Sequence, residues 1–161
     1  VAELLETSVA SVNSALQRAR ATLDASEVGT TETPDSVDAE LLARYVEAFE
    51  QYDMDALTSL ISEDAKQSMP PFDMWLAGRD DILSWWVGPG NGCRGSKVIP
   101  TIAANGSPAF AQYKPNEAGD GYEPWALQVL EIEDGKIVEF TFFLDTERVF
   151  PLFGVPLEYA A

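Results

Sequence analysis

The stretch WALQVLEIEDGKIVEFTFFL, from Trp125 to Leu144, decides the fold of this chain. Two runs rich in aromatic and aliphatic residues flank Asp134-Gly135, a dipeptide typical of a tight β-hairpin turn. Both faces of the first run are apolar, since Trp125, Leu127 and Val129 alternate with Ala126, Leu130 and Ile132. We therefore expect a sheet buried on both sides, with helices on one face and either a dimer partner or a ligand cavity on the other.

The segments before this hairpin complete the expected domain. Asn105-Gly106 is a second hairpin dipeptide, and it joins strands expected at residues 96–104 and 107–114. Helical spacing and capping residues predict three helices and one short strand further upstream. They are a helix from Asp35 or Ser36 to Phe49, a short helix capped by Asp53, a strand at 65–69 that ends at Pro70-Pro71, and a helix that opens at Gly78. Helices followed by antiparallel strands predict an α+β domain.

Composition excludes several classes of chemistry. The 161 residues include 27 acidic and 10 basic side chains, no histidine and a single cysteine, Cys93, and the formal net charge is −17. Serine–histidine and cysteine–histidine nucleophile pairs, internal disulfides and multi-cysteine metal sites are therefore excluded, and we expect no metal or other cofactor. The negative charge disfavours overall binding to nucleic acid or to an anionic membrane, so any DNA contact must be local. No apolar run is long enough to span a bilayer, and a reducing cytoplasm is the expected location.

Residues 1–24 differ from the rest of the chain, because they contain no aromatic residue, proline or glycine. They predict two helical pieces, the second capped by Thr7-Ser8 and apolar at Val9, Val12 and Leu16. Residues 25–36 are polar and contain Gly29 and Pro34, which is typical of a flexible acidic linker. Residues 37–161 form the second domain, with 21 acidic against 8 basic residues, a net charge of −13.

The first segment carries a motif. Ala2-Glu3-Leu4-Leu5 is followed by Ser8-Val9-Ala10-Ser11-Val12-Asn13-Ser14-Ala15-Leu16-Gln17-Arg18-Ala19-Arg20. This run resembles the C-terminal half of the helix-turn-helix in region 4 of extracytoplasmic-function (ECF) sigma factors. The resemblance implies contact with the promoter −35 element through Ser11, Asn13, Ser14, Gln17, Arg18 and Arg20. The alternative is an amphipathic helix that packs on a neighbouring domain.

The second domain carries its own markers in order along the chain. They are Leu42-Ala43-Arg44-Tyr45-Val46-Glu47-Ala48-Phe49, Asp55-Ala56-Leu57, Met69-Pro70-Pro71 leading to Trp75-Leu76-Ala77-Gly78-Arg79, Asp134-Gly135-Lys136-Ile137 and Phe142-Phe143-Leu144-Asp145. This series is similar to SnoaL-like domains of the ketosteroid isomerase and nuclear transport factor 2 superfamily. The similarity implies a cone-shaped, curved antiparallel or mixed sheet packed with three helices.

The two resemblances together imply a known fusion. One subgroup of ECF sigma factors carries a SnoaL-like domain directly after region 4, and this chain would be a C-terminal fragment of such a protein. The implied function is promoter-specific transcription initiation with RNA polymerase core and promoter DNA as partners. The SnoaL-like domain would then regulate sigma activity in cis, through contacts to the other sigma domains and by binding a small apolar ligand.

An apolar cavity is the site that the second resemblance implies. Candidate lining residues are Asp73, Trp75, Trp85, Trp86, Tyr113, Trp125, Glu139 and Phe142. The aromatic residues among them could equally be plain core. Asp73 and Glu139 are candidates for the general base of an isomerase, cyclase or hydrolase, the alternative function, but neither matches a catalytic pattern and we assign no catalytic residue.

Two further alternatives concern surfaces. The sheet face could form a homodimer. The apolar segment from Phe150 to Pro156 could cap the cavity mouth, dock on another sigma domain or pack as a tail, and packing is the default for such a segment.

Overall fold

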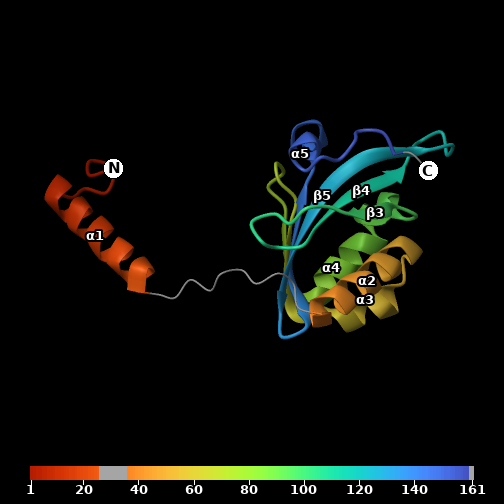
Figure 1. The fold of residues 1–161 in the computed structure, drawn as a ribbon, viewed down its shortest axis with the longest axis horizontal. Helices are drawn as coiled ribbons and strands as arrows, with labels where there is room; N and C mark the ends of the chain where they lie inside the picture. Colours follow the sequence, from red (N-terminus) through yellow and green to blue (C-terminus); the bar gives the residue numbers. More distant parts are fainter. Residues whose placement is uncertain (26–35, 160–161) are drawn as a thin grey trace. The chain divides into compact units, whose positions relative to one another are not determined.

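The computed structural model describes residues 1–25 and 36–159, and it divides into two units, Val1–Glu32 and Thr33–Ala161 (Figure 1). Residues 26–35, which make up almost all of the expected linker at 25–36, lie outside the described residues. The two units are therefore described separately.

The first unit contains helix α1 (Val9–Ala25). Its start is capped as expected, because the backbone N–H of Ser11 donates to the hydroxyl oxygen of Ser8 at 3.1 Å. The helical piece expected before it is instead a single turn, which ends where Glu6 adopts a φ of 49°. The expectation of two helices was wrong for the described residues of this unit, because the short segment before Ser8 forms only one turn.

The second unit is built on an open, curved sheet of six strands in the order β2-β1-β6-β5-β4-β3. Its strands are β1 (Ile61–Ser68), β2 (Trp75–Ala77), β3 (Lys97–Pro100), β4 (Ala109–Pro115), β5 (Tyr122–Glu133) and β6 (Lys136–Phe143). Strands β1 and β6 run parallel, and the other neighbouring pairs are antiparallel. Register shifts in β1, β4 and β5 add local twist and bend the sheet. The prediction of a mixed, curved sheet in an α+β fold is confirmed.

Three helices cover one face of this sheet, which we call the helix face (Figure 1). They are α2 (Ser36–Gln51), α3 (Met54–Leu60) and α4 (Arg79–Val87). The predicted caps are present: the carboxylate of Asp53 accepts a hydrogen bond from the N–H of Ala56 at 3.0 Å, and Gly78, with a φ of 102°, precedes α4.

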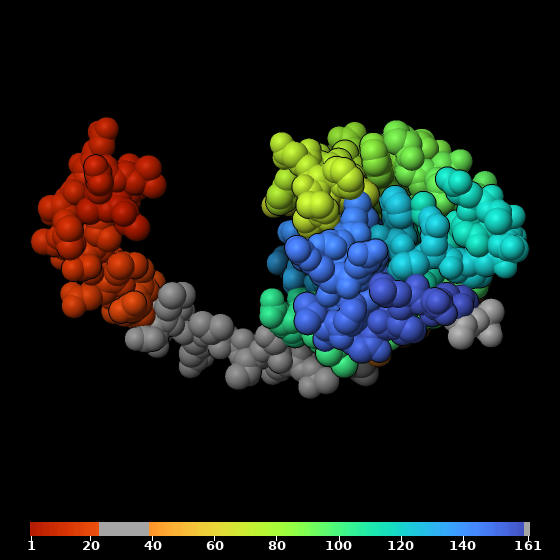
Figure 2. All heavy atoms as spheres, turned by 90° about the horizontal axis from the view of Figure 1, so that it is seen from above, coloured from red at the N-terminus to blue at the C-terminus, as the bar shows by residue number. Residues whose placement is uncertain are grey.

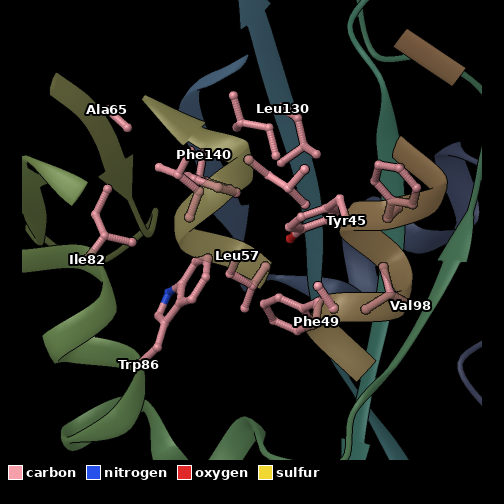
Figure 3. Close-up of a cluster of buried hydrophobic side chains, with 14 of the residues drawn as sticks. Tyr45, Phe49, Leu57, Ala65, Ile82, Trp86, Val98, Leu130 and Phe140 are labelled. Atoms are coloured by element: carbon pink, nitrogen blue, oxygen red, sulfur yellow. The ribbon is translucent and has the colours of Figure 1, made fainter. Parts of the chain in front are cut away.

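The main core lies between these helices and the sheet. Tyr45 of α2 and Trp86 of α4 both contact the ring of Phe140 on β6, at centroid separations of 6.0 and 5.4 Å. Figure 3 shows these rings pointing toward one another from three different elements, with Leu57 of α3 beside them. Each of these aromatic side chains is almost fully buried, and aromatic pairs in such geometry add about 1 kcal/mol each beyond the buried area.

The opposite face of the sheet is covered in part by the C-terminal segment of the chain itself. Helix α5 (Thr146–Leu152) places Phe150 against Tyr113 of β4, with ring centroids 5.5 Å apart. The hydroxyl of Tyr113 then donates to the carbonyl of Pro156 at 2.6 Å, and its ring packs on Tyr159. In Figure 2 this dark blue segment lies beside the blue and cyan strands at the molecular surface. The packed-tail alternative therefore describes this segment.

The two predicted turns are present, but several strand boundaries differ from those predicted. Both hairpin turns form, with positive φ at Asn105-Gly106 and Asp134-Gly135. Strand β3 ends at Pro100 rather than at residue 104, although the backbone N–H of Thr101 still donates to the carbonyl of Ala109 at 2.9 Å. Strand β1 starts at Ile61, directly after α3. Strand β2 and helix α5 were not predicted, because each is only a few residues long.

Replacing Phe150 by alanine tests the cover on the opposite face. Phe150 is fully buried, so we expect Phe150→Ala to lower the free energy of unfolding by about 3 to 5 kcal/mol, measured by urea denaturation. Leu152→Ala is the control on the same helix, and we expect a change within about 0.5 kcal/mol because Leu152 is 76% exposed. Equal losses in the two variants would contradict the packing of α5.

Candidate functional site

A cavity of about 320 Å³ opens on the helix face, between α4 and the strands. Its walls come from the end of α2, β1 and the loop after it, α4, the 3-10 helix η1 (Pro89–Cys93), β4, β5 and β6. The lining residues are Phe49, Tyr52, Gln67, Met69, Phe72, Met74, Trp85, Trp86, Pro89, Gly90, Gly92, Cys93, Gln112, Lys114, Trp125, Phe142 and Leu144. The lining is mainly aromatic and aliphatic, as in pockets that bind small organic molecules.

Four of the eight pocket residues predicted from the sequence line this cavity: Trp85, Trp86, Trp125 and Phe142. They meet there because α4 supplies two neighbouring tryptophans and because Trp125 and Phe142 lie on the helix face of adjacent strands.

The other four predicted residues lie outside the cavity, three because of the sheet face that they occupy and Asp73 because it lies in an exposed loop. Trp75 pairs with Ser68, places its side chain on the opposite face and is 68% exposed. Tyr113 points to the opposite face and packs on α5. Glu139 lies on that face as well, in register with Lys66 and Glu131. Asp73 is exposed, although its neighbours Phe72 and Met74 both line the cavity.

Sequence reasoning missed the polar residues of the wall: Tyr52, Gln67, Cys93, Gln112 and Lys114. A signal did exist for two of them. Gln67 and Gln112 each lie inside a strand that the sequence predicts, at 65–69 and 107–114, and a glutamine buried in a strand needs a specific hydrogen-bonding partner.

Gln67 and Trp86 form the polar contact nearest the centre of the core. The indole N–H of Trp86 donates to the amide oxygen of Gln67 at 2.7 Å, and the two side chains are 6% exposed or less. This bond ties α4 to β1 at the wall of the cavity. Breaking one partner of such a buried bond costs about 1 to 3 kcal/mol, because the other is left unsatisfied.

A chain of hydrogen bonds runs from the core to the cavity wall. The hydroxyl of Tyr45 donates to Gln128 at 2.8 Å, and the amide N–H of Gln128 donates to Gln112 at 2.9 Å. Gln112 in turn donates to Ser96 at 3.0 Å, whose hydroxyl donates to the carbonyl of Cys93 at 2.6 Å. Burial raises the pKa of Tyr45 far above its ordinary value, and the nearby Cys93 raises it further, so the first donor keeps its proton.

Lys114, the charged residue of the cavity wall, is paired with an acidic side chain. The ammonium of Lys114 forms an ion pair with Glu123 at 3.0 Å and lies 4.1 Å from the ring centroid of Trp125. Trp125 is thus held by a cation–π contact at the edge of the cavity. Tyr52 donates its hydroxyl to the backbone carbonyl of Trp86, and burial raises the pKa of Tyr52.

Cys93 is a neutral thiol at physiological pH. Burial raises the pKa of this thiol, while a hydrogen bond from Gln112 and the nearby charge of Lys114 lower it by less. A thiol with a raised pKa is a poor nucleophile near pH 7.

The cavity lacks the groups for carboxylate acid–base chemistry. Among its lining residues, all within the described part of the chain, there is no aspartate or glutamate. The described residues also contain no cluster of three or more cysteine, aspartate or glutamate side chains that could hold a metal ion. Within the described ranges, no helix is long and apolar enough to cross a membrane. The lining of the cavity therefore fits the binding of an apolar molecule.

The residues predicted to contact DNA lie in the first unit. Ser11, Asn13, Ser14, Gln17, Arg18 and Arg20 are all exposed on α1. The described residues of this unit contain α1 and the preceding turn, so a complete helix-turn-helix is not present in them.

The family model described as "SnoaL-like domain" matches residues 42–140, more than half of the chain. The chain belongs to the SnoaL-like domain family. It is also 40% identical over 166 aligned residues to the ECF RNA polymerase sigma factor SigG of Mycobacterium tuberculosis. That alignment covers 97% of this chain and 43% of SigG, so the chain spans less than half the length of this relative.

Solved structures agree on the fold of this SnoaL-like domain. The ECF sigma factor SigJ of Mycobacterium tuberculosis superposes with a TM-score of 0.55 and 21% identity, covering 98% of this chain and 55% of SigJ. An LEH-like epoxide hydrolase of the same organism superposes with a TM-score of 0.54 and 17% identity, covering 76% of this chain and 89% of that one. At these identities the two structures show a shared fold and nothing about activity.

The raised pKa of Cys93 predicts slow alkylation of the folded chain. Because a smaller fraction is thiolate at a given pH, the iodoacetamide rate should rise with pH around a midpoint above that of free cysteine in the same buffer. The urea-unfolded chain is the control and should titrate like free cysteine. A folded-state midpoint below that of free cysteine would contradict this description of the thiol.

Proposed function

We propose that this chain is part of an ECF sigma factor that directs RNA polymerase to a subset of promoters in the cytoplasm. The observation that carries the proposal is the 40% identity to SigG, which extends over 97% of the chain and so includes both structural units. The SnoaL-like domain regulates sigma activity in cis and binds a small apolar ligand in its cavity. The lining is mainly apolar, and the described residues that form it include no aspartate or glutamate, which supports binding over catalysis.

In this proposal, α1 contributes to promoter contact in the whole protein. Its exposed face offers amide, hydroxyl and guanidinium groups that can bond phosphates and base edges. Residues 1–24 carry a net charge of only −1, with Glu3, Glu6 and Asp24 against Arg18 and Arg20. The strong negative charge lies in the second domain, where it would favour contact with basic surfaces of the sigma factor.

A small-molecule enzyme of the isomerase, cyclase or hydrolase type is the alternative, and the epoxide hydrolase shows that the fold hosts enzymes. The cavity disfavours it here, because Asp73 and Glu139 do not line it. A homodimer through the sheet would have to use the area that α5 leaves open, near the partly exposed Ile99 and Phe143, and sedimentation tests it directly.

Deleting residues 37–161 from the whole sigma factor tests regulation in cis. We expect the deletion to change promoter-dependent transcription by about fivefold or more in a reconstituted assay with RNA polymerase core. A change of about fivefold corresponds to the lower end of common coupling free energies between two sites. The same deletion in a non-cognate promoter assay is the control. Unchanged output from the cognate promoter would overturn cis-regulation.

Filling the cavity tests ligand binding separately. A side chain at Gly92 would begin in open space, since a Cβ there meets nothing within 4 Å, so Gly92→Phe can place its ring in the cavity. We expect it to weaken binding of the neutral fluorescent probe N-phenyl-1-naphthylamine by about tenfold, measured by titration. Asn91→Phe is the control, because Asn91 is exposed and does not line the cavity. Equal affinities in the two variants would place the probe elsewhere.

A further inference from the structure

Gln67 holds an unused hydrogen-bond donor at the cavity wall. An indole nitrogen can only donate, so the oxygen of the Gln67 side-chain amide must face Trp86, and this fixes which way round the amide lies. The amide nitrogen, Nε2, is then turned away from the indole. Among the described residues it has no hydrogen-bond acceptor, although Gln67 is 1% exposed and lines the cavity.

Three other polar residues of the wall already have hydrogen-bonding or ion-pair partners. Gln112 accepts from Gln128 and donates to Ser96, and Tyr52 donates to the carbonyl of Trp86. Lys114 is paired with Glu123. Gln67 therefore offers the cavity a donor, Nε2, which has no acceptor among the described residues and is accessible from the cavity rather than buried within the protein.

The same groups exclude a charged ligand. A bound carboxylate would have to share Lys114 with Glu123, which already neutralises its charge, and a bound cation would find no carboxylate among the described lining residues. Moving a charge from water into a largely apolar cavity removes its hydration, and this cost is not repaid without a free counter-charge. An uncharged molecule avoids both costs.

We propose that the cavity binds an uncharged, mainly apolar and flat molecule whose carbonyl oxygen accepts a hydrogen bond from Nε2 of Gln67. This inference rests on the proposed function and names the chemical class of its ligand. Trp85 and Trp86 on one side and Trp125 and Phe142 on the other supply ring faces for stacking. Figure 3 shows the Trp86 indole projecting from α4 toward the core. A cavity of about 320 Å³ accommodates a molecule of two or three fused rings.

A matched pair of probes tests the carbonyl. 9-Fluorenone and fluorene have the same tricyclic frame and differ by a carbonyl in place of a methylene group. We expect the 161-residue chain to bind fluorenone about fivefold to tenfold more tightly, measured by equilibrium dialysis, since one hydrogen bond is worth that ratio.

Variants assign the preference to Gln67. Gln67→Leu should bind both probes equally, whereas Gln128→Leu, which removes another fully buried glutamine away from the wall, should keep the preference for fluorenone. Gln67→Leu leaves the indole N–H of Trp86 without an acceptor, which destabilises the fold. The double variant Gln67→Leu with Trp86→Phe removes both hydrogen-bonding partners, so no buried donor is left unsatisfied. Ile99→Ala, outside the cavity, is a second control and should keep the preference.

Each outcome decides the inference. Loss of the preference in both Gln67 variants and its retention in the two controls supports it. Equal binding of both probes by the unmodified chain, an unchanged preference in the Gln67 variants, or no binding of either probe overturns it. The proposed regulation in cis is decided independently by the transcription assay, which uses no probe.

Discussion

A sheet with two apolar faces imposes the main constraint on this domain, because both faces must leave water. Helices α2, α3 and α4 cover one face through the contacts of Tyr45, Phe49 and Trp86 with the sheet. The chain covers much of the other face itself, through α5 and the tail that follows it. Burying large aromatic side chains on both sides supplies the dominant favourable term of folding. The cavity exists because the helices that cover the first face leave its edge between η1 and the strands incompletely filled.

Buried glutamines give this apolar core its specific geometry. Gln67, Gln112 and Gln128 are at most 1% exposed, and each makes hydrogen bonds with defined partners. A shift of one residue in β1, β4 or β5 would turn one of these amides to the other face and leave its partners unsatisfied, which penalises alternative registers. The chain from Tyr45 through Gln128 and Gln112 also joins α2 to the cavity wall by direct contacts. A polar network with its members bonded is rigid, so it positions the wall for a ligand.

The cavity lining and the positions of the carboxylates favour binding over acid–base catalysis in the proposed function. The chain has many carboxylates, but those proposed for catalysis lie outside the cavity, and the lining offers a neutral thiol, amides and an ion-paired lysine. Enzymes of this general type need a base placed at the reacting atom. The identity with SigG covers both units. In the proposed function the domain acts beside a sigma factor, where binding energy can shift an equilibrium without turnover.

The sequence by itself determined the order of most helices and strands, because hairpin dipeptides, helix caps and apolar spacing are local signals, whereas it did not predict the short strand β2 and helix α5. The cap at Asp53, the helix start at Gly78, and the turns at Asn105-Gly106 and Asp134-Gly135 all lie where the local sequence predicts them. The site was only half predictable: Trp85, Trp86, Trp125 and Phe142 meet in the cavity, whereas Trp75 and Tyr113 face away from it. Which face a strand residue occupies depends on register shifts and on pairing with distant strands, and only the tertiary structure decides those. For the same reason, only the fold shows that Gln67 and Trp86, 19 residues apart, bond to each other and leave the amide nitrogen of Gln67 without an acceptor among the described residues.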